Sequence, residues 1–190
     1  MENEVKNNAM HIVIILDKSG SMASLGKEAV EGVNDFLSKQ KENPGEDLYS
    51  LCLFNNELEV KADSIPLKDA KPLDESSYNP RGTTALLDAI GTFVSRVEER
   101  KEKGLFVIMT DGKENASSKY SYFEIKGKIS ELEKEGWKFI FLSSGIEARA
   151  EGEKLSFSLS FNGTREKGQV RRMFCCAKEE ASLFRKQEKK

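Results

Sequence analysis

The sequence predicts a three-layer α/β/α domain with a doubly wound (Rossmann-like), mostly parallel six-stranded sheet. Two short apolar runs, 11–16 and 105–109, are typical of strands buried on both faces. Segments with helical spacing of apolar residues alternate with strands, and this alternation favours right-handed crossovers between parallel strands. The 190 residues are the length of about one domain. We therefore assign 1–190 to a single domain and expect 1–9 and 186–190 to be flexible.

The first half of the chain predicts three strands and two helices. In order, these are a strand at 11–17, a helix at 25–39, strands at 48–54 and 58–62, and a helix from Leu86. The tight turn Asn55-Asn56 predicts that the second and third strands form a hairpin, which places one antiparallel strand at the sheet edge. We interpret 63–78 as irregular and the charged run 98–103 as the solvated last two turns of the second helix.

The second half of the chain continues the alternation. In order, it predicts a strand at 105–109, a helix at 122–132, a strand at 137–142, a helix at 146–154, a strand at 157–161 and a helix at 170–184. Ser121 and Glu124 have the spacing of a capping box, which predicts the start of the first of these helices. We expect Thr164 to cap the final helix.

Composition argues against several functional classes. Charged residues make up 33% of the chain but the net charge is only −2, which argues against nucleic-acid binding through phosphate attraction. No apolar run approaches the length of a membrane span, and the polar first ten residues do not resemble a secretory signal, so we expect a cytoplasmic protein. The three cysteines are too few and too badly spaced for a disulfide framework or a zinc site.

Oxygen-bearing side chains follow the two central strands. Asp17, Ser19 and Ser21 come at the end of the first strand, Asp111 follows the strand at 105–109, and Thr83-Thr84 precede a helix. Open α/β sheets bind ligands at the carboxyl ends of their strands, so these groups converge if the two strands are neighbours. A set of oxygen ligands without His or Cys suits a hard divalent cation, Mg²⁺ first, with Mn²⁺ or Ca²⁺ as alternatives.

Three motifs resemble the von Willebrand factor type A (VWA) domain family, which includes the integrin I domains. The run 17–21 (DKSGS) is similar to the family's Asp-x-Ser-x-Ser signature. The run 82–90 (GTTALLDAI) resembles its threonine loop with the following helix, and 105–112, which ends in Thr-Asp-Gly, resembles its third motif. The motifs occur in the family's order, and 139–185 also resembles bacterial and phage members. The resemblance implies a VWA-like fold.

The resemblance also implies a metal-ion-dependent adhesion site. The implied ligands are Asp17, Ser19, Ser21, Thr84 and Asp111. The serines would bind the cation directly, the carboxylates directly or through water, and the loop threonine would change between these two modes. Thr84 fits that position because the family's loop has Gly-Gly-Thr where this chain has Gly82-Thr83-Thr84. Thr83, Gly82 and Gly112 could bind the metal or shape the loop.

These features favour a metal-dependent binding module, in which the cation recruits an exposed Asp or Glu of a partner protein. We expect a monomer that binds neither nucleic acid nor membrane. The alternatives are a Mg²⁺-dependent hydrolase or phosphoryl-transfer enzyme and a metal-free structural domain. Against an enzyme, Ser19 stands where a phosphatase-type pair would have its second aspartate, and no glycine-rich phosphate loop is present. His11, the only histidine, starts a strand, and we interpret it as structural.

Overall fold

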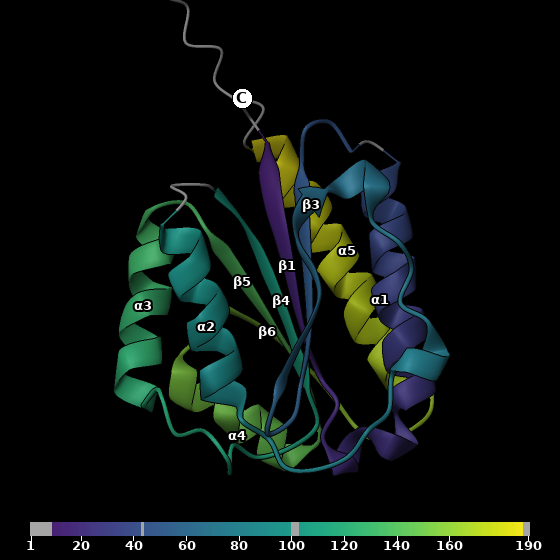
Figure 1. Cartoon of the computed structure of the whole chain (residues 1–190), viewed down its shortest axis with the longest axis vertical. Coiled ribbons are helices and arrows are strands. Elements are labelled where there is room, and N and C mark those ends of the chain that lie inside the picture. Colours follow the sequence, from purple (N-terminus) through teal and green to yellow (C-terminus); the bar gives the residue numbers. More distant parts are fainter. Residues whose placement is uncertain (1–8, 43, 100–102, 188–190) are drawn as a thin grey trace, which may run out of the picture.

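A six-stranded sheet lies between two layers of helices in the computed structural model, which describes residues 9–42, 44–99 and 103–187 (Figure 1). The strands are β1 (Met10–Asp17), β2 (Leu48–Phe54), β3 (Leu58–Pro66), β4 (Lys103–Thr110), β5 (Lys138–Ser144) and β6 (Leu159–Gly163). The helices are α1 (Gly26–Lys41), α2 (Leu86–Glu98), α3 (Tyr122–Lys134), α4 (Ile146–Leu155) and α5 (Gln169–Gln187). Of the predicted flexible ends, 1–8 and 188–190 lie outside the described residues.

The strand order is β3-β2-β1-β4-β5-β6, with β3 antiparallel to β2 and the other neighbours parallel. This arrangement confirms the predicted fold class, including the antiparallel edge strand. Helices α1 and α5 cover one face of the sheet, while α2 and α3 cover the other (Figure 1). Because both faces are covered, successive residues of β1 enter different cores: Ile14 packs with α1 and α5, and Ile15 packs with α2.

Strand β3 is longer than predicted, and its second part lies within 63–78, which we expected to be irregular. The strand continues to Pro66 through a change of register against β2. Ser64 has a φ of 52°, and its backbone N–H donates to the Ser50 hydroxyl at 2.8 Å. A bulge on a half-exposed edge strand breaks the alternation of apolar residues. The strand predicted from that alternation therefore ended before the bulge.

Two other boundaries differ from the predictions. Helix α2 ends at Glu98, and Lys103 already belongs to β4, so the charged run does not form two further helical turns; residues 100–102 lie outside the described residues. Strand β6 begins two residues later than predicted; Phe157, which was counted in it, precedes the strand and stacks on Phe141 (ring centroids 4.8 Å apart).

Thr164 does not cap the final helix, since α5 begins only at Gln169. The Thr164 hydroxyl instead accepts a hydrogen bond from the Glu166 N–H (3.3 Å), and its carbonyl accepts one from Ser144 (3.0 Å). By contrast, the predicted capping box is present: Ser121 and Glu124 exchange side-chain hydrogen bonds at the start of α3.

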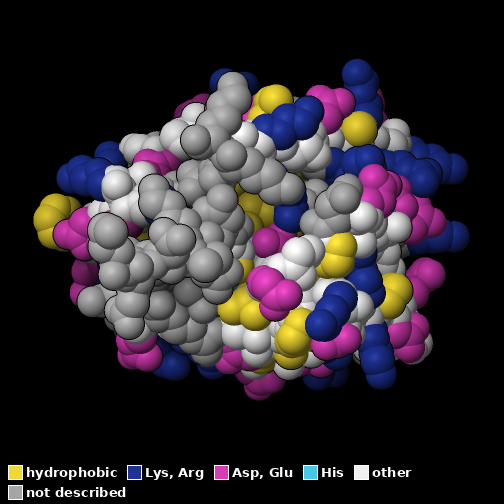
Figure 2. Space-filling view, turned by 90° about the horizontal axis from the view of Figure 1, so that it is seen from above, with side chains coloured by type: hydrophobic (Ala, Val, Ile, Leu, Met, Phe, Trp, Pro, Cys, Tyr) yellow, Lys and Arg dark blue, Asp and Glu magenta, His cyan; other side chains and the backbone are white. Residues whose placement is uncertain are grey.

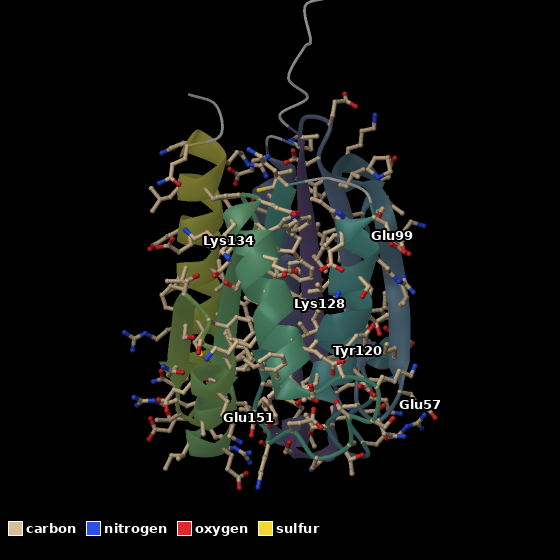
Figure 3. All side chains as sticks on the ribbon, turned by 90° about the vertical axis from the view of Figure 1, so that its left-hand side faces the viewer. Glu57, Glu99, Tyr120, Lys128, Lys134 and Glu151 are labelled. Carbon is tan, nitrogen blue, oxygen red and sulfur yellow. The ribbon has the colours of Figure 1, made fainter. Side chains whose placement is uncertain are left out.

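The carboxyl ends of the parallel strands share one edge of the sheet, which is the lower end in Figure 1, where α4 lies. Glu57 from the β2–β3 turn, Tyr120 from the segment before α3, and Glu151 from α4 lie toward this end, whereas Glu99 lies toward the other (Figure 3). The opposite end shows dark blue and magenta side chains interspersed over its described part (Figure 2). His11 lies at that opposite end of β1, buried and hydrogen-bonded to Ser50 (2.9 Å).

Candidate functional site

The loop that follows β1 is held by the side chain of Asp17. Its Oδ1 accepts a 2.6 Å hydrogen bond from the backbone N–H of Ser19, which closes a tight turn. The buried Tyr78 hydroxyl donates to the Asp17 carbonyl and fixes the end of the strand. The turn brings the hydroxyls of Ser19 and Ser21 to 3.2 Å from one another.

The end of β4 meets this loop directly. The Thr110 hydroxyl donates to Asp17 Oδ2 at 2.6 Å, and the Ser21 hydroxyl donates to Asp111 Oδ1 at 2.6 Å. These bonds are possible because β1 and β4 are parallel neighbours, with Leu16 paired with Met109. The structure therefore brings together the two carboxylates and both serines of the predicted set.

The threonine loop packs against the same end of the sheet through backbone hydrogen bonds. The N–H of Gly20 donates to the carbonyl of Gly82 at 3.0 Å. Farther along, Thr84 exchanges two bonds with Asn115: its N–H donates to Asn115 Oδ1 (2.8 Å), and its carbonyl accepts from the Asn115 N–H (3.0 Å). Thr84 is buried in this position and Thr83 is exposed. Of the two adjacent threonines, Thr84 is the one brought to the cluster.

Gly112 shows how closely the hydroxyls converge. A Cβ at this residue would lie 3.2 Å from Thr84 Oγ1, 3.3 Å from Ser21 Oγ and 3.9 Å from Ser19 Oγ. Three hydroxyl oxygens from two loops thus face the place where a side chain would begin. Gly82 shapes its loop in another way, because its φ of 76° favours glycine and a Cβ there would clash with Asn56 Oδ1 at 2.3 Å. Gly112 therefore leaves room among the hydroxyls, and Gly82 leaves room for Asn56 against the threonine loop.

The two carboxylates are held in an environment that disfavours their charge. Asp17 and Asp111 have no exposed surface. Burial raises the pKa of Asp17 to about 6, and the hydrogen bonds from Thr110 and Ser19 only partly oppose this shift. Burial also raises the pKa of Asp111, against the hydrogen bond from Ser21 and the charge of Arg165. A cation bound between them would stabilise both ionised forms.

Asp111 retains one oxygen without a hydrogen bond. Its Oδ2 is buried and has no hydrogen-bond partner, and the Arg165 Nη2 lies 3.3 Å away, within ion-pair range but outside hydrogen-bond geometry. No three His, Cys, Asp or Glu side chains in the described ranges are grouped so as to hold a metal ion. The two carboxylates and three hydroxyls nevertheless fit a hard divalent cation, since such ions accept neutral oxygen ligands and retain water.

The sequence matches the von Willebrand factor type A domain family over residues 11–184. The chain belongs to this family. VWA domains are protein-interaction modules, and the match covers all five candidate ligands. No curated protein gives a significant match to the sequence.

Solved structures share the VWA fold at low sequence identity. The pilus adhesin SpaC from Lactobacillus rhamnosus GG, in an open conformation, has a TM-score of 0.72 and 12% identity, over 94% of this chain and 30% of SpaC. The von Willebrand factor domain of the pilus tip protein Mfa5 from Porphyromonas gingivalis has a TM-score of 0.68 and 10% identity, over 92% of this chain and 95% of that domain.

A third structure carries a metal. Proximal thread matrix protein 1 from the mussel byssus, with zinc in its metal-ion-dependent adhesion site (MIDAS) motif, has a TM-score of 0.55 and 17% identity, over 93% of this chain and 47% of that protein. At these identities the structures establish the fold of this VWA domain. None of the helices in its described part is long and apolar enough to cross a membrane.

Several supporting residues of the VWA domain were not among the predicted site residues. Thr110 orients Asp17, Tyr78 anchors the end of β1, and Asn115 holds Thr84. The position of Thr110 next to Asp111 was a usable signal, because in a parallel pair it lies beside the end of β1. Tyr78 and Arg165 gave no sequence signal, since their contacts depend on segments 61 and 54 residues away.

Two acidic residues near the cluster shape the segment between β4 and α3. Asp88 accepts hydrogen bonds from the N–H groups of Ser118, Lys119 and Tyr120, at 2.9–3.1 Å. Glu114 accepts one from the N–H of Leu87 (3.0 Å), at the start of α2. These carboxylates are occupied with backbone donors and tie the segment that carries Asn115 to the helix after Thr84.

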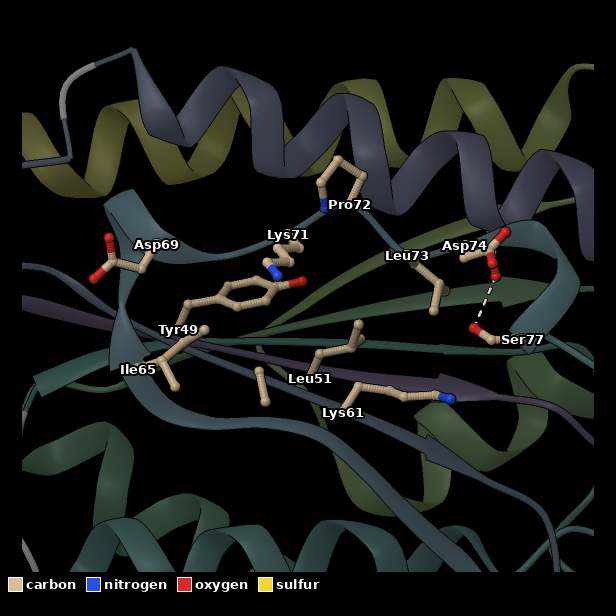
Figure 4. Close-up of a pocket in the computed structure, with 11 residues that line it drawn as sticks. Tyr49, Leu51, Lys61, Ile65, Asp69, Lys71, Pro72, Leu73, Asp74 and Ser77 are labelled. Carbon is tan, nitrogen blue, oxygen red and sulfur yellow. Dashed lines mark hydrogen bonds between the residues drawn. The ribbon is translucent and has the colours of Figure 1, made fainter.

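A separate cavity of about 320 Å³ lies away from the cluster, between β2, β3 and the segment 69–77 (Figure 4). Its lining mixes apolar residues such as Leu51 and Ile65 with the charged residues Lys61 and Asp69. None of the candidate ligands lines it. The residues that the sequence predicts as cation ligands therefore lie at the strand ends and not in this cavity.

Proposed function

We propose that this VWA domain is a metal-dependent protein-binding module whose cation recruits an acidic side chain of a partner protein. The cation would be held by Asp17, Ser19, Ser21, Thr84 and Asp111. The observation that carries the proposal is the convergence of three hydroxyls on Gly112, beside two fully buried carboxylates. The exposed position of Ser21 leaves this cluster open to an external ligand.

We propose Mg²⁺ as the physiological ion. Mg²⁺ prefers oxygen ligands and retains several waters, so a site with two carboxylates and three hydroxyls is sufficient. Mn²⁺ accepts the same ligands and serves as an experimental substitute. Because hydroxyl ligands are neutral, an ion bound in this way would keep enough positive charge to attract a further carboxylate.

The chain's own residues would keep the site in place while the partner binds. Thr110 and the Ser19 N–H hold both oxygens of Asp17, and Asn115 holds the backbone of Thr84. We propose that no bond is made or broken in this process. The cluster contains no histidine or cysteine that could act as a base or nucleophile.

Calorimetric titration with Mn²⁺ and Mg²⁺ tests the site. We expect one ion per chain for the wild type and at least tenfold weaker binding for Ser21→Ala, since a direct ligand is lost. Ser182→Ala on α5 removes a hydroxyl that bonds only within its helix and should bind like the wild type. Equal binding by Ser21→Ala and Ser182→Ala would contradict the proposed ligand set.

Affinity capture tests the module itself. Immobilised wild-type domain should retain a partner in Mg²⁺ and release it in EDTA, and folded Asp17→Ala should retain none. Release of phosphate from generic substrates by the wild type, above that of Asp17→Ala, would favour the enzymatic alternative. Capture that is the same in Mg²⁺ and EDTA would exclude a role for the cation.

A further inference from the structure

Arg165 lies against the candidate cation site from the segment between β6 and α5. Its Nη2 donates a 2.8 Å hydrogen bond to the backbone carbonyl of Asp111 and lies 3.3 Å from Asp111 Oδ2. A Cβ at Gly145, after β5, would be 3.5 Å from Arg165 Nε, so the guanidinium is placed close to the ends of two neighbouring strands. Nearly half of its side chain, 47%, remains exposed.

The guanidinium is held in a way that leaves donors available. Both of its contacts with Asp111 are made by Nη2, and the bond to the backbone carbonyl does not depend on the charge of the carboxylate. A guanidinium carries five N–H donors in a rigid fork, so Nε and Nη1 can serve an external acceptor. Arg165 therefore places a positive charge beside the site.

The Asp111 carboxylate separates Arg165 from the hydroxyl cluster. Its Oδ1 accepts the hydrogen bond from Ser21, whereas its Oδ2 lies 3.3 Å from Arg165 Nη2. A cation held by the hydroxyls would thus lie on one side of the Asp111 side chain, and the Arg165 guanidinium lies on the other. Two separate positive groups at one edge of the sheet suit two negative groups on a partner.

The charges at the site make this arrangement favourable. A divalent cation balances the charges of Asp17 and Asp111, which leaves Arg165 as an additional positive charge.

We propose that Arg165 is a second cationic anchor, and that the partner is recognised through paired acidic side chains, one at the cation and one at Arg165. This inference rests on the proposed function. A partner with a single acidic side chain would engage the cation and leave Arg165 without a ligand. A segment with two Asp or Glu residues a few positions apart would engage both.

Titration with Mn²⁺ alone tests the placement of the charge. Removal of the positive charge in Arg165→Gln should tighten Mn²⁺ binding about three- to tenfold, and Arg165→Lys should stay close to the wild type. Arg149→Gln, which removes an exposed α4 arginine paired with Glu153, is the matched control and should change little. Identical Mn²⁺ affinities for Arg165→Gln and Arg149→Gln would overturn the proposal.

Selection from a random peptide display library in Mn²⁺ tests the partner chemistry. We expect the wild type to enrich peptides with two nearby acidic residues. A synthetic peptide from this pool should bind Arg165→Gln at least tenfold more weakly than the wild type. Replacing one of its acidic residues by Gln should cost affinity in the wild type and none in Arg165→Gln, because that residue's ligand is already lost.

The outcomes separate this inference from the proposed function. Enrichment of single-acid peptides only, no enrichment, or additive effects of the peptide and Arg165 substitutions would overturn the paired-acid inference. Single-acid peptides that require Mn²⁺ would still support the metal-dependent module. Peptide binding that persists in EDTA would instead overturn the proposed function.

Discussion

The Ser21 hydroxyl donates a 2.6 Å hydrogen bond to Asp111 Oδ1 across a separation of 90 residues. The bond joins the loop after β1 to the end of β4, and it forms at the edge where the carboxyl ends of neighbouring parallel strands meet. Two neutral hydroxyls, Ser19 and Ser21, are thereby placed beside two buried carboxylates.

The melting temperature of the domain should rise when Mg²⁺ or Mn²⁺ is added. An ion that binds only the folded chain stabilises it by about 2.7 kcal/mol at roughly one hundred times its dissociation constant. For a chain of this size, that corresponds to an increase of about 5–10 °C, measured by calorimetry or circular dichroism. EDTA should reverse the increase, and Asp17→Asn should not show it. A melting temperature that is the same with either ion and with EDTA would contradict the metal site.

The adjacent threonines should differ sharply in their effect on the cation. Thr84→Val keeps the shape of a buried side chain but removes the hydroxyl that faces Gly112, so we expect Mn²⁺ affinity to fall about tenfold or more. Thr83→Val changes an exposed side chain one residue earlier and should leave the affinity within about twofold. Calorimetric titration of both variants measures the difference. A larger loss of affinity for Thr83→Val than for Thr84→Val would show that Thr83, and not Thr84, binds the cation.

The sequence was sufficient for those parts of the fold that depend on local pattern. The continuous apolar runs that became β1 and β4 could be recognised because both faces of the sheet are covered, and Ser121 with Glu124 marked the start of α3. The end of β3 could not be recognised, since its bulge at Ser64 depends on a hydrogen bond to β2. The predicted cap at Thr164 failed for a similar reason: threonine suits a helix N-cap, but this threonine lies in a turn before the helix begins.

The candidate site was only partly predictable for a related reason. Motif order and strand ends identified the residues that carry oxygen, because parallel strands place such residues at one edge. The groups that orient them come from elsewhere: Tyr78 reaches Asp17 from the long connection after β3, and Arg165 reaches Asp111 from the segment after β6. Such contacts depend on the three-dimensional packing of long connections, which leaves no periodic signal in the sequence.

Metal affinity should decrease as the pH falls, because Asp17 becomes protonated. Burial raises the pKa of this carboxyl to about 6 in the absence of metal, so a proton competes with the cation below that pH. In the metal-free domain, the same shift favours the folded state at pH below 3.8, and this contribution is lost as the pH rises through about 6. The stabilisation by metal should therefore increase over the same interval.

Calorimetric titration at two pH values measures this competition. We expect Mn²⁺ to bind about tenfold more weakly at about pH 5 than at about pH 7.5, with proton release near pH 6. Asp17→Asn should bind weakly at both values. An affinity that does not change over this range would show that Asp17 is ionised before the cation arrives.

The space kept by Gly112 should be required for metal binding but not for folding. In Gly112→Ala, the new Cβ would lie 3.2 Å from Thr84 Oγ1 and 3.3 Å from Ser21 Oγ, so both hydroxyls must move by a few tenths of an ångström. We expect at least a tenfold loss of Mn²⁺ affinity, because small displacements of ligands weaken the octahedral geometry that these ions prefer. The melting temperature in EDTA should fall by only a few degrees.

Gly127→Ala is the matched control for this substitution. A Cβ at Gly127 in α3 would meet nothing within 4 Å beyond its chain neighbours and its own helix backbone, and alanine favours the helix over glycine by about 1 kcal/mol. This variant should therefore melt slightly higher than the wild type and bind Mn²⁺ equally well. If Gly112→Ala also retained full affinity, the three hydroxyls would not all be ligands of one ion, and the cation would have to lie elsewhere along the edge of the sheet.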